Sequence, residues 1–304
     1  MKVFMTGGTG FVGTSLVRRL TELGHNVTVL TRSIREDYRL PEGASFLEGN
    51  PTRKGAWQEK VPENEIIINL AGSSIFRRWT NKAKRSIRDS RILTTQNLVE
   101  ALSGRTGKET IFLSTSAVGY YGFQGDTELD ELSPTGGGFI ASLVQDWEAA
   151  ALKAEEFGVR VVVCRFGIVL GRTGGALGMM LPLFKWYLGS SLGPGTQWFS
   201  WIHQQDLVNI YLFLINQRDI SGPVNCTAPH PVRNREMTEI LADVLGKRSH
   251  LPSVPSFIIR LFLGEFGSVL LKGQKVLPKR LLDMGFQFEF PEFRAALKDL
   301  LCTD

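Results

Sequence analysis

The sequence KVFMTGGTGFVG at residues 2–13 predicts a strand, a glycine-rich turn and the beginning of a helix. Residues 2–6 form a short apolar run, and glycines follow at positions 7, 10 and 13. Behind the turn, apolar side chains recur with helical spacing at Leu16, Val17, Leu20 and Leu23. Gly24 then marks the expected end of the helix, and the β-branched run at residues 27–31 predicts a second strand.

This strand–turn–helix unit is typical of a dinucleotide-binding site. Glycines in the turn let the backbone approach a pyrophosphate, and the helix N-terminus offers free N–H donors and the positive end of its dipole. A glycine pattern alone is weak evidence, but here the strand and the helix stand where such a site needs them. The alternative is a tight turn without a ligand. The residues expected to contact the cofactor in this unit are Gly7, Thr9, Gly10, Phe11, Val12 and Gly13.

The end of the second strand predicts which dinucleotide binds. An NAD site usually carries Asp or Glu there, which accepts hydrogen bonds from the ribose 2′-hydroxyl. This chain has Thr31-Arg32-Ser33 instead, and no carboxylate until Glu36. A guanidinium would bind the 2′-phosphate that a carboxylate repels. We therefore expect NADP(H), with Thr31 and Arg32 as contacts; the alternative is that Arg32 is a solvated loop residue.

The composition is that of an enzyme-sized protein rather than a nucleic-acid-binding or membrane protein. The chain has 304 residues and a net charge of +5, from 35 basic and 30 acidic residues, which is too small and too dispersed to indicate nucleic acid. Cys164, Cys226 and Cys302 form no C-x-x-C pair, no leader precedes the first strand, and no apolar run is long enough to span a membrane. The 4 histidines are isolated, so no metal site is expected. We expect a cytoplasmic protein with no membrane or nucleic-acid partner.

A second set of cofactor contacts is expected after the strand at residues 65–72. This continuous apolar run ends in Leu70-Ala71-Gly72, and ligands of open parallel sheets bind at the carboxyl ends of the strands. The basic segment 77–91 follows, for which a solvated helix face is a commoner explanation than a nucleic-acid patch. Arg91 differs, because it shares a helical stripe with apolar residues and so points inward. An inward arginine needs an anion, which is either a cofactor phosphate or an internal Asp or Glu.

The next strand, within residues 110–122, ends in the hydroxyl side chains of Ser114-Thr115-Ser116 and in the tyrosine pair Tyr120-Tyr121. With the opening unit, it resembles the extended short-chain dehydrogenase/reductases, the nucleotide-sugar epimerase and dehydratase group. More closely, the chain resembles an atypical subfamily often labelled epimerase-family or cell-division-inhibitor protein. Further motifs of the resemblance are Gly119–Gly122, Asp146–Glu148, Gly174–Ala176, Trp201–His203 with Asp206, Ala228–Asn234, Gly273–Pro278 and Gly285-Phe286. The resemblance covers the whole chain and implies that Thr31-Arg32, Leu70-Ala71, Arg91 and the Gly167-Ile168 region contact NADP.

The resemblance also implies where the chemistry takes place, and there the sequence departs from the family pattern. Extended reductases use a Ser or Thr on the fifth strand and a Tyr-x-x-x-Lys on the next helix, whose Tyr is the acid/base and whose Lys lowers its pKa. Ser116 matches the serine, but alignment on Glu148 puts Ile140 and Val144 where Tyr and Lys belong. Neither can move a proton. We expect Ser116 to be catalytic, with the Tyr120-Tyr121 pair as the nearest candidates for the proton transfer.

The second half of the chain carries fewer motifs that predict its structure or function. Residues 160–171 predict one more buried strand, and the glycine-rich segment 171–195 surrounds the apolar run Met179–Phe184, whose methionines are expected to pack rather than to line a substrate pocket. A helix is predicted from about Asp206, the candidate N-cap, to Asn216. His203 is expected to be a structural imidazole, with a proton donor at the site as the alternative.

Together these patterns predict an α/β protein with a doubly wound parallel-sheet Rossmann fold and a smaller C-terminal substrate lobe. Residues 1–170 and 201–228 would form the NADP-binding domain, and residues 171–200 and 229–304 the lobe that closes over the nicotinamide. The expected function is that of an NADP(H)-dependent oxidoreductase or epimerase acting on an unidentified small metabolite. The alternative is a catalytically silent NADP(H)-binding sensor or scaffold. A homodimer is possible, and the sequence does not distinguish it from a monomer.

Overall fold

A seven-stranded parallel sheet forms the centre of the protein, in a computed structural model that describes residues 1–34, 38–105, 109–247 and 251–302. The strand order is β11-β7-β5-β4-β1-β2-β3, so the chain winds outward in both directions from β1 and β4. The strands are β1 Lys2–Thr6, β2 Asn26–Thr31, β3 Ala44–Glu48, β4 Ile66–Asn69, β5 Ile111–Ala117, β7 Arg160–Phe166 and β11 Gly222–Cys226. This order confirms the doubly wound Rossmann fold, in which ligands bind where the winding reverses.

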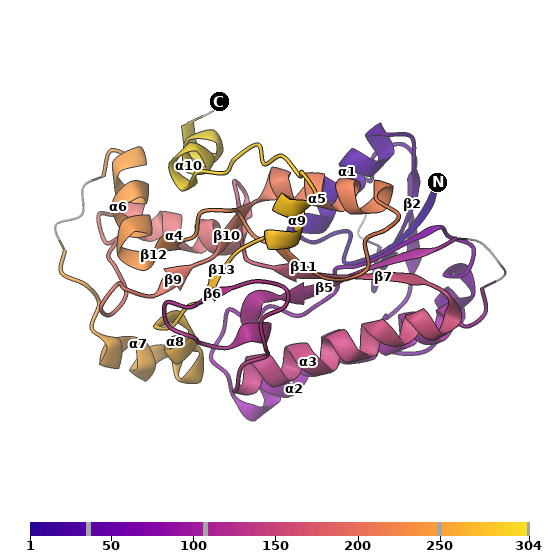
Figure 1. The fold of residues 1–304 in the computed structure, drawn as a ribbon, viewed down its shortest axis with the longest axis horizontal. Helices are drawn as coiled ribbons and strands as arrows, with labels where there is room; N and C mark the ends of the chain where they lie inside the picture. Colours follow the sequence, from indigo (N-terminus) through magenta and orange to yellow (C-terminus); the bar gives the residue numbers. More distant parts are fainter. Residues whose placement is uncertain (35–37, 106–108, 248–250, 303–304) are drawn as a thin grey trace.

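Helices cover both faces of this sheet (Figure 1). On one face lie α1 Phe11–Glu22 and α5 Gln204–Asn216, and on the other α2 Asn81–Leu102 and α3 Phe139–Leu152. Three short 3₁₀ turns complete this part: η1 Ala56–Lys60, η2 Val118–Tyr121 and η3 Lys153–Phe157. Because the central strands are covered on both sides, β4 reads as three consecutive isoleucines followed by Asn69, and all four of its residues are buried.

The remaining elements gather at one end of the molecule, on the left in Figure 1, and we call them the small lobe. Its strands form the pairs β8–β10, β9–β12 and β6–β13, with bounds β6 Glu128–Leu129, β8 Ile168–Gly171, β9 Trp198–Phe199, β10 Trp201–His203, β12 Val232–Arg233 and β13 Lys275–Val276. Its helices are α4 Gly175–Lys185, α6 Asn234–Val244, α7 Ser256–Leu263, α8 Glu265–Leu270 and α10 Phe293–Cys302, while α9 Lys279–Asp283 lies beside β11. The division of the chain into two domains stays a prediction: one domain would comprise residues 1–170 and 201–228, and the other residues 171–200 and 229–304.

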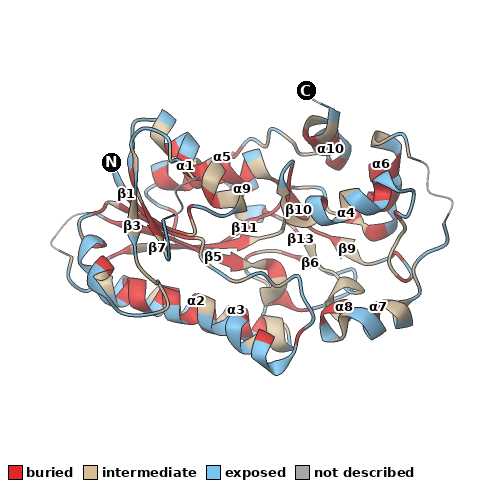
Figure 2. Ribbon diagram, turned by 180° about the vertical axis from the view of Figure 1, so that it is seen from behind, coloured by how far each residue is buried: buried red, intermediate tan, exposed pale blue. Residues whose placement is uncertain are grey.

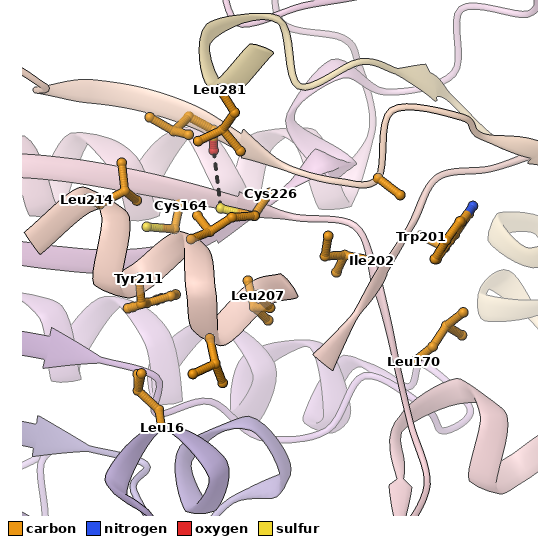
Figure 3. Packing of buried hydrophobic residues seen from close by; sticks show 14 of the residues in the cluster. Leu16, Cys164, Leu170, Trp201, Ile202, Leu207, Tyr211, Leu214, Cys226 and Leu281 are labelled. Carbon is orange, nitrogen blue, oxygen red and sulfur yellow. Dashed lines mark hydrogen bonds between the residues drawn. The ribbon is translucent and has the colours of Figure 1, made fainter. Parts of the chain in front are cut away.

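The largest apolar core joins the sheet to the small lobe (Figure 2). Figure 3 shows part of this core, in which Leu207 lies near Tyr211 of α5, and Ile202 and then Trp201 continue it toward the small lobe. The thiols of Cys164 and Cys226 are free and buried in this core, and that of Cys302 is free and exposed. No helix within the described ranges is long and apolar enough to cross a membrane.

Two sequence predictions about this region are wrong in detail. Residues 160–171 are two strands, because the chain leaves the central sheet at Gly167, where a Cβ atom would lie 2.8 Å from the Ser200 carbonyl oxygen. The helix predicted from Asp206 begins at Gln204 instead, and His203 is its N-cap. The Asp206 carboxylate accepts hydrogen bonds from the backbone N–H groups of Glu289 and Phe290, at 2.8 and 3.0 Å, and so anchors the C-terminal segment.

The expectation that the methionines of the apolar run 179–184 pack inside is also wrong for Met179. On α4, Leu177 and Phe184 face the core, but Met179 and Leu183 are exposed. Positions 179, 183 and 186 lie on the opposite face of the same helix, since α-helices repeat every 3.6 residues. The helix is therefore apolar on both faces, although only one of them is covered.

Candidate functional site

The turn between β1 and α1 is built so that no side chain occupies its centre. Gly7 has φ +73°, and a Cβ atom there would lie 2.7 Å from the Leu70 carbonyl carbon of the neighbouring strand end. A Cβ atom on Gly13 would lie 2.2 Å from the Gly7 carbonyl oxygen. The first turn of α1 begins at Phe11, with Gly10 as N-cap and no acidic side chain nearby. Free N–H groups at this helix end and a bare backbone form a cradle that fits a pyrophosphate.

The Phe11 ring joins this turn to the small lobe. It fills a space bounded by Gly171, Gly174 and Gly175, where added Cβ atoms would lie 2.5, 2.7 and 2.9 Å from ring atoms. The Gln204 side chain donates a hydrogen bond to the Phe11 carbonyl oxygen at 2.7 Å. The glycines in the segment after β8 therefore have a packing role, which is to admit this ring. Val12, the next predicted cofactor contact, packs against the large apolar core that joins the sheet to the small lobe.

The other predicted cofactor contacts lie at the carboxyl ends of β2 and β4. Arg32 follows the last residue of β2 directly and is exposed, and the Thr31 hydroxyl donates to the Ser33 carbonyl oxygen at 3.0 Å. Leu70 follows β4 and donates its backbone N–H to the Thr6 carbonyl oxygen at 3.1 Å. Because β1, β2 and β4 are adjacent, these chain ends border one edge of the sheet, where the predicted cofactor would lie.

Arg91 on α2 points toward this edge, as the sequence predicts. A Cβ atom on Gly72 would lie 3.0 Å from the Arg91 guanidinium carbon, so the two are in contact. The guanidinium donates to the carbonyl oxygens of Ser73 and Ile87, at 3.0 and 3.1 Å, and lies 5.3 Å from the Trp147 ring centre. Among the described residues no carboxylate forms an ion pair with it. Burial, with the nearby charge of Arg77, lowers the pKa of Arg91 to about 10.

A buried chain of hydrogen bonds fixes α2 and α3 to the sheet beside Arg91. The Thr6 hydroxyl donates to Asn69 at 2.7 Å, and the Asn69 amide donates to the Thr95 hydroxyl at 2.9 Å. Thr95 in turn donates to the Arg91 carbonyl oxygen at 2.8 Å and accepts from the Trp147 indole at 2.9 Å. The carboxyl ends of β1 and β4 are therefore held rigidly against the helix that carries Arg91.

Ser116, the predicted catalytic serine, lies in a buried ionic network. Its hydroxyl donates to Glu148 Oε1 at 2.5 Å. The Arg165 guanidinium binds the same carboxylate in a fork, with Nε 2.8 Å from Oε1 and Nη2 2.8 Å from Oε2. Burial disfavours the charged guanidinium, but Glu148 and Tyr121 more than offset this and raise the pKa of Arg165. The network therefore keeps a charged pair beneath Ser116.

The tyrosine pair extends this network. The Tyr121 hydroxyl accepts from Arg165 at 2.8 Å and donates to the Asn225 side chain at 2.7 Å, and the ring is fully buried. Burial raises the pKa of Tyr121 to about 12, although Arg165 opposes the shift. The neighbouring Tyr120 ring lies 3.6 Å from the Arg165 guanidinium carbon. With both hydrogen bonds of its hydroxyl satisfied internally, Tyr121 is placed to hold Arg165 rather than to reach a substrate.

The positions that would carry Tyr and Lys are apolar in the structure as in the sequence. The Ile140 side chain packs against Gly119, where a Cβ atom would lie 2.2 Å from its Cγ2, and Val144 is buried in α3. Neither Ile140 nor Val144 offers a group that titrates.

Ile168, another predicted cofactor contact, begins β8, and its backbone N–H donates to the Ser200 carbonyl oxygen at 2.8 Å.

His203 has structural partners. Its Nδ1 accepts the Gln205 backbone N–H at 3.1 Å, its Nε2 lies 3.3 Å from Asp299 Oδ2, and its ring packs against that of Phe290, tilted by 35° with centres 4.0 Å apart. Burial lowers the pKa of His203 to about 4, against the opposing charge of Asp299. The imidazole therefore caps α5 and holds the C-terminal segment. No cluster of three or more His, Cys, Asp or Glu side chains that could hold a metal ion occurs among the described residues.

A cavity of about 750 Å³ opens in the small lobe, next to the loop that follows η2. Its walls carry aromatic rings and cations: the Arg233 guanidinium carbon lies 3.9 Å from the Trp198 ring centre, and Lys272 Nζ lies 5.3 Å from that of Phe123. Arg233 is paired with Asp126 at 2.8 Å, and Arg235 donates to the Pro194 carbonyl oxygen at 3.1 Å. Glu236 and Glu239 also line the cavity.

Comparison with known proteins agrees with this architecture. Residues 3–226 match the NAD dependent epimerase/dehydratase family. The chain belongs to that family. Residues 254–300 match a second family, described as a domain of unknown function, DUF1731, which covers α7 to α10 of the small lobe.

Two curated relatives match almost the whole chain. The epimerase family protein SDR39U1 homolog, chloroplastic, of Arabidopsis thaliana is 41% identical over 303 residues, which are 99% of this chain and 87% of the relative. An epimerase family protein of Staphylococcus aureus strain MRSA252 is 40% identical over 306 residues and covers 99% of both.

Solved structures give the same assignment. Human epimerase family protein SDR39U1, isoform 2, crystallised with NADPH, superposes with a TM-score of 0.87 at 35% identity over 100% of both chains. A nucleoside-diphosphate sugar epimerase from Corynebacterium glutamicum gives a TM-score of 0.80 at 32% identity and covers 99% of this chain and 58% of that one. These relatives confirm the family resemblance expected from the sequence.

Two features of the site were not predicted from the sequence. The fork between Arg165 and Glu148 joins residues of different elements, and the only available signal was an arginine inside the apolar strand 160–166, which needs a buried partner. The cavity around Trp198 and Arg233 joins segments far apart in the chain, so no local pattern could show it.

Proposed function

We propose that this protein binds NADP(H) at the β1–α1 turn and catalyses hydride transfer with a small anionic metabolite. The observation that carries the proposal is Arg91, a cation directed at the edge of the dinucleotide cradle with only carbonyl oxygens and an aromatic ring as its partners in the described structure. A buried cation without an anion is costly, and a cofactor phosphate or ribose-linked anion would relieve that cost. Human SDR39U1, of the same family, was crystallised with NADPH, which supports the choice of cofactor.

The residues that would hold NADP(H) have distinct roles. The backbone of Gly7, Gly10 and Gly13, with Thr9, Phe11 and Val12, would enclose the pyrophosphate at the α1 N-terminus. Arg32 would bind the 2′-phosphate beside Thr31, and Leu70, Ala71 and Gly72 would border the adenosine side. Ile168 would lie near the nicotinamide end. When bound, the nicotinamide supplies or accepts the hydride.

For the proton transfer that accompanies hydride transfer, the structure offers the Ser116 hydroxyl and the Glu148 carboxylate that it contacts. A substrate alcohol would donate its proton to Ser116 Oγ while the Ser116 proton passes to Glu148 Oε1, 2.5 Å away. The result is a carbonyl product, a hydroxyl on Ser116 and a neutral Glu148; reduction runs through the same steps in reverse. This relay would replace the missing Tyr and Lys, while Tyr121 positions Arg165.

The cavity beside Trp198 would hold the rest of the substrate. Arg235 and Lys272 face it without an ion-pair partner among the described carboxylates, and two aromatic rings flank it. The two cations favour an anionic group of the ligand near them and the aromatic rings favour a flat or ring-shaped part, while Glu236 and Glu239 in the same wall would accept hydrogen bonds from its hydroxyl or amine groups. Lys272→Ala and Arg235→Ala should raise KM more than they lower kcat, because neither side chain belongs to the Ser116 hydrogen-bond network that would carry the proton.

The second candidate is a silent NADP(H)-binding sensor or scaffold. It is favoured by Ser116, whose hydroxyl donates to Glu148 and is almost fully buried, and by Ile140 and Val144 at the usual acid/base positions. On this proposal cofactor binding would be retained and no substrate would turn over.

Mass spectrometry of small molecules released from the purified protein, followed by turnover of each with NADP(H), separates the two candidates. We expect little activity on standard sugar-nucleotide epimerase and broad carbonyl-reductase substrates. With the true substrate, Ser116→Ala should lower turnover by about 10²-fold or more while NADP(H) affinity is unchanged. Turnover that Ser116→Ala leaves intact would exclude the relay, and cofactor binding without any turnover would favour the sensor.

We also propose a cytoplasmic location, since Cys164 and Cys226 are free thiols. The partners would be a small molecule and no nucleic acid. A homodimer is compatible with the fold, and sedimentation velocity of the purified chain would decide its presence.

A further inference from the structure

Two helices of the small lobe leave apolar faces uncovered. On α7, Ile259 and Leu263 pack inward, while Phe257 and Leu261, on the opposite side, are 70% and 68% exposed and Phe262 is 71% exposed. The end of α4 carries Trp186, which is 77% exposed, followed by the exposed Tyr187 and Leu188. A helix that is apolar all round is normally buried, so these faces lack the partner for which they are suited.

Backbone hydrogen bonds join the two exposed segments. The Val254 N–H donates to the Ser191 carbonyl oxygen at 2.9 Å, and the Gly193 N–H donates to the Val254 carbonyl oxygen at 2.8 Å. The two segments that this junction joins carry seven exposed apolar or aromatic side chains, which we call the apolar ledge: Trp186, Tyr187, Leu188, Leu251, Phe257, Leu261 and Phe262. Figure 2 shows α7 at the end of the molecule away from the N-terminus, while α4 begins at Gly175 beside the Phe11 ring and ends at the exposed Trp186 segment.

The charges on the ledge all have one sign. The sequence has no Asp or Glu between Glu156 and Asp206, nor between Asp243 and Glu265, and these two stretches contain the whole ledge. Its exposed cations include Lys185 beside Trp186 and Arg260 within α7. Lys247 donates to the Tyr187 hydroxyl at 2.9 Å and lies over its ring, 4.3 Å from the centre. The face is therefore apolar, aromatic and basic.

We propose that the apolar ledge docks on an anionic lipid surface. Tryptophan, tyrosine and phenylalanine side chains favour the membrane interface, and lysine and arginine at their edge contact anionic headgroups. A second copy of this chain fits the face less well, because a symmetric contact would bring like charges together. The absence of a long apolar run excludes a spanning helix among the described residues and has no bearing on surface docking, for which short amphipathic helices suffice. The inference does not depend on the proposed hydride transfer.

Flotation of the full-length protein with vesicles tests the proposal. The protein should float with phosphatidylcholine vesicles that contain roughly one third phosphatidylglycerol, bind vesicles of phosphatidylcholine alone at least about tenfold more weakly, and lose binding as salt is added. The double variant Phe257→Ser/Leu261→Ser should weaken partitioning about a hundredfold, since both side chains lie on the outer face of α7. Arg260→Glu, which keeps the apolar face, should weaken it roughly tenfold.

Leu93→Ser is the matched control, because Leu93 is an exposed apolar residue on α2 that does not belong to the ledge. It should float like the wild type, and circular dichroism should show that all variants are folded. The proposal is overturned if the wild type does not float with anionic vesicles at low salt, or if the double variant floats equally well. A dimer that the double variant abolishes, with no vesicle binding, would assign the ledge to a second copy instead.

Discussion

The Ser116 hydroxyl lies 2.5 Å from Glu148 Oε1, and Arg165 holds the other side of that carboxylate in a two-bond fork. The serine that extended reductases use to contact substrate is thus joined to a buried ion pair in a chain that lacks their Tyr and Lys. In this arrangement Glu148, reached through Ser116, could take the proton-transfer role of the missing Tyr and Lys. The same hydrogen bond also joins Ser116 of β5 to Glu148 of α3 and so holds the strand against the helix.

Glu148→Gln should be strongly destabilising. It leaves the Arg165 guanidinium buried without a counter-ion, which costs roughly 3–5 kcal/mol of unfolding free energy. The matched control is Asp146→Asn on the same helix, whose ion pair with Arg88 is exposed and should contribute less than about 1 kcal/mol. Urea denaturation of both variants measures the difference; equal effects would mean that the buried pair does not contribute as its geometry indicates.

Tyr121→Phe separates a positioning role from an acid/base role. Loss of the hydroxyl should cost about 1–2 kcal/mol in unfolding free energy, because Arg165 and Asn225 each lose a partner. NADP(H) affinity should not change, and turnover should fall far less than for Ser116→Ala. A complete loss of turnover with normal stability would instead make Tyr121 the proton-transfer group.

Arg91→Ala should weaken NADP(H) binding by about tenfold or more, since the guanidinium faces the cofactor edge beside Gly72. Arg85→Ala on the exposed face of the same helix is the control and should bind like the wild type. Calorimetric titration gives both affinities. If the two variants behave alike, Arg91 serves only to hold the Ser73 and Ile87 carbonyl groups.

His203 should make stability depend on pH. Burial lowers its pKa to about 4, from about 6.5 in the unfolded chain, so between these values the unfolded state binds a proton that the folded state does not. Stability is therefore full above pH 6.5 and falls by up to about 3 kcal/mol as the pH drops toward 4.

The variant His203→Asn keeps an N-cap acceptor for Gln205 but cannot titrate, so its unfolding free energy should change less over this range. Unfolding free energies measured at several pH values between 4 and 7 provide the comparison. If the unfolding free energy of His203→Asn falls with pH as steeply as that of the wild type, the lowered pKa of His203 is contradicted.

The strands β1, β2, β4, β5 and β7 of the central sheet could be predicted because each one carries its own local signal. The turn at Gly7 to Gly13 needs a bare backbone, and β4 opens with three consecutive isoleucines, so both can be recognised in a short window of sequence. The inward direction of Arg91 followed from helical spacing for the same reason. These features depend on neighbours in the chain and not on distant ones.

The misplaced features depend on distant neighbours. Asp206 resembles an N-cap, but its carboxylate binds the backbone near Glu289, a contact that no local pattern shows. The break at Gly167 follows from its closeness to Ser200, and Met179 is exposed because no described segment covers the face of α4 opposite Leu177 and Phe184. Sequence periodicity shows that a face is apolar, but not whether anything packs on it.

The central claim is that this chain binds NADP(H) at the β1–α1 turn and selects it through Arg32. Calorimetric titration of the purified protein with NADPH and with NADH tests it most directly, with Arg32→Ala as the variant and Arg19→Ala, on the exposed side of α1, as its control. NADPH should bind the wild type at least about tenfold more tightly than NADH, a difference of about 1.4 kcal/mol, and Arg32→Ala alone should remove that preference. Equal affinities of the wild type for the two cofactors, or a preference that survives Arg32→Ala, would contradict the claim.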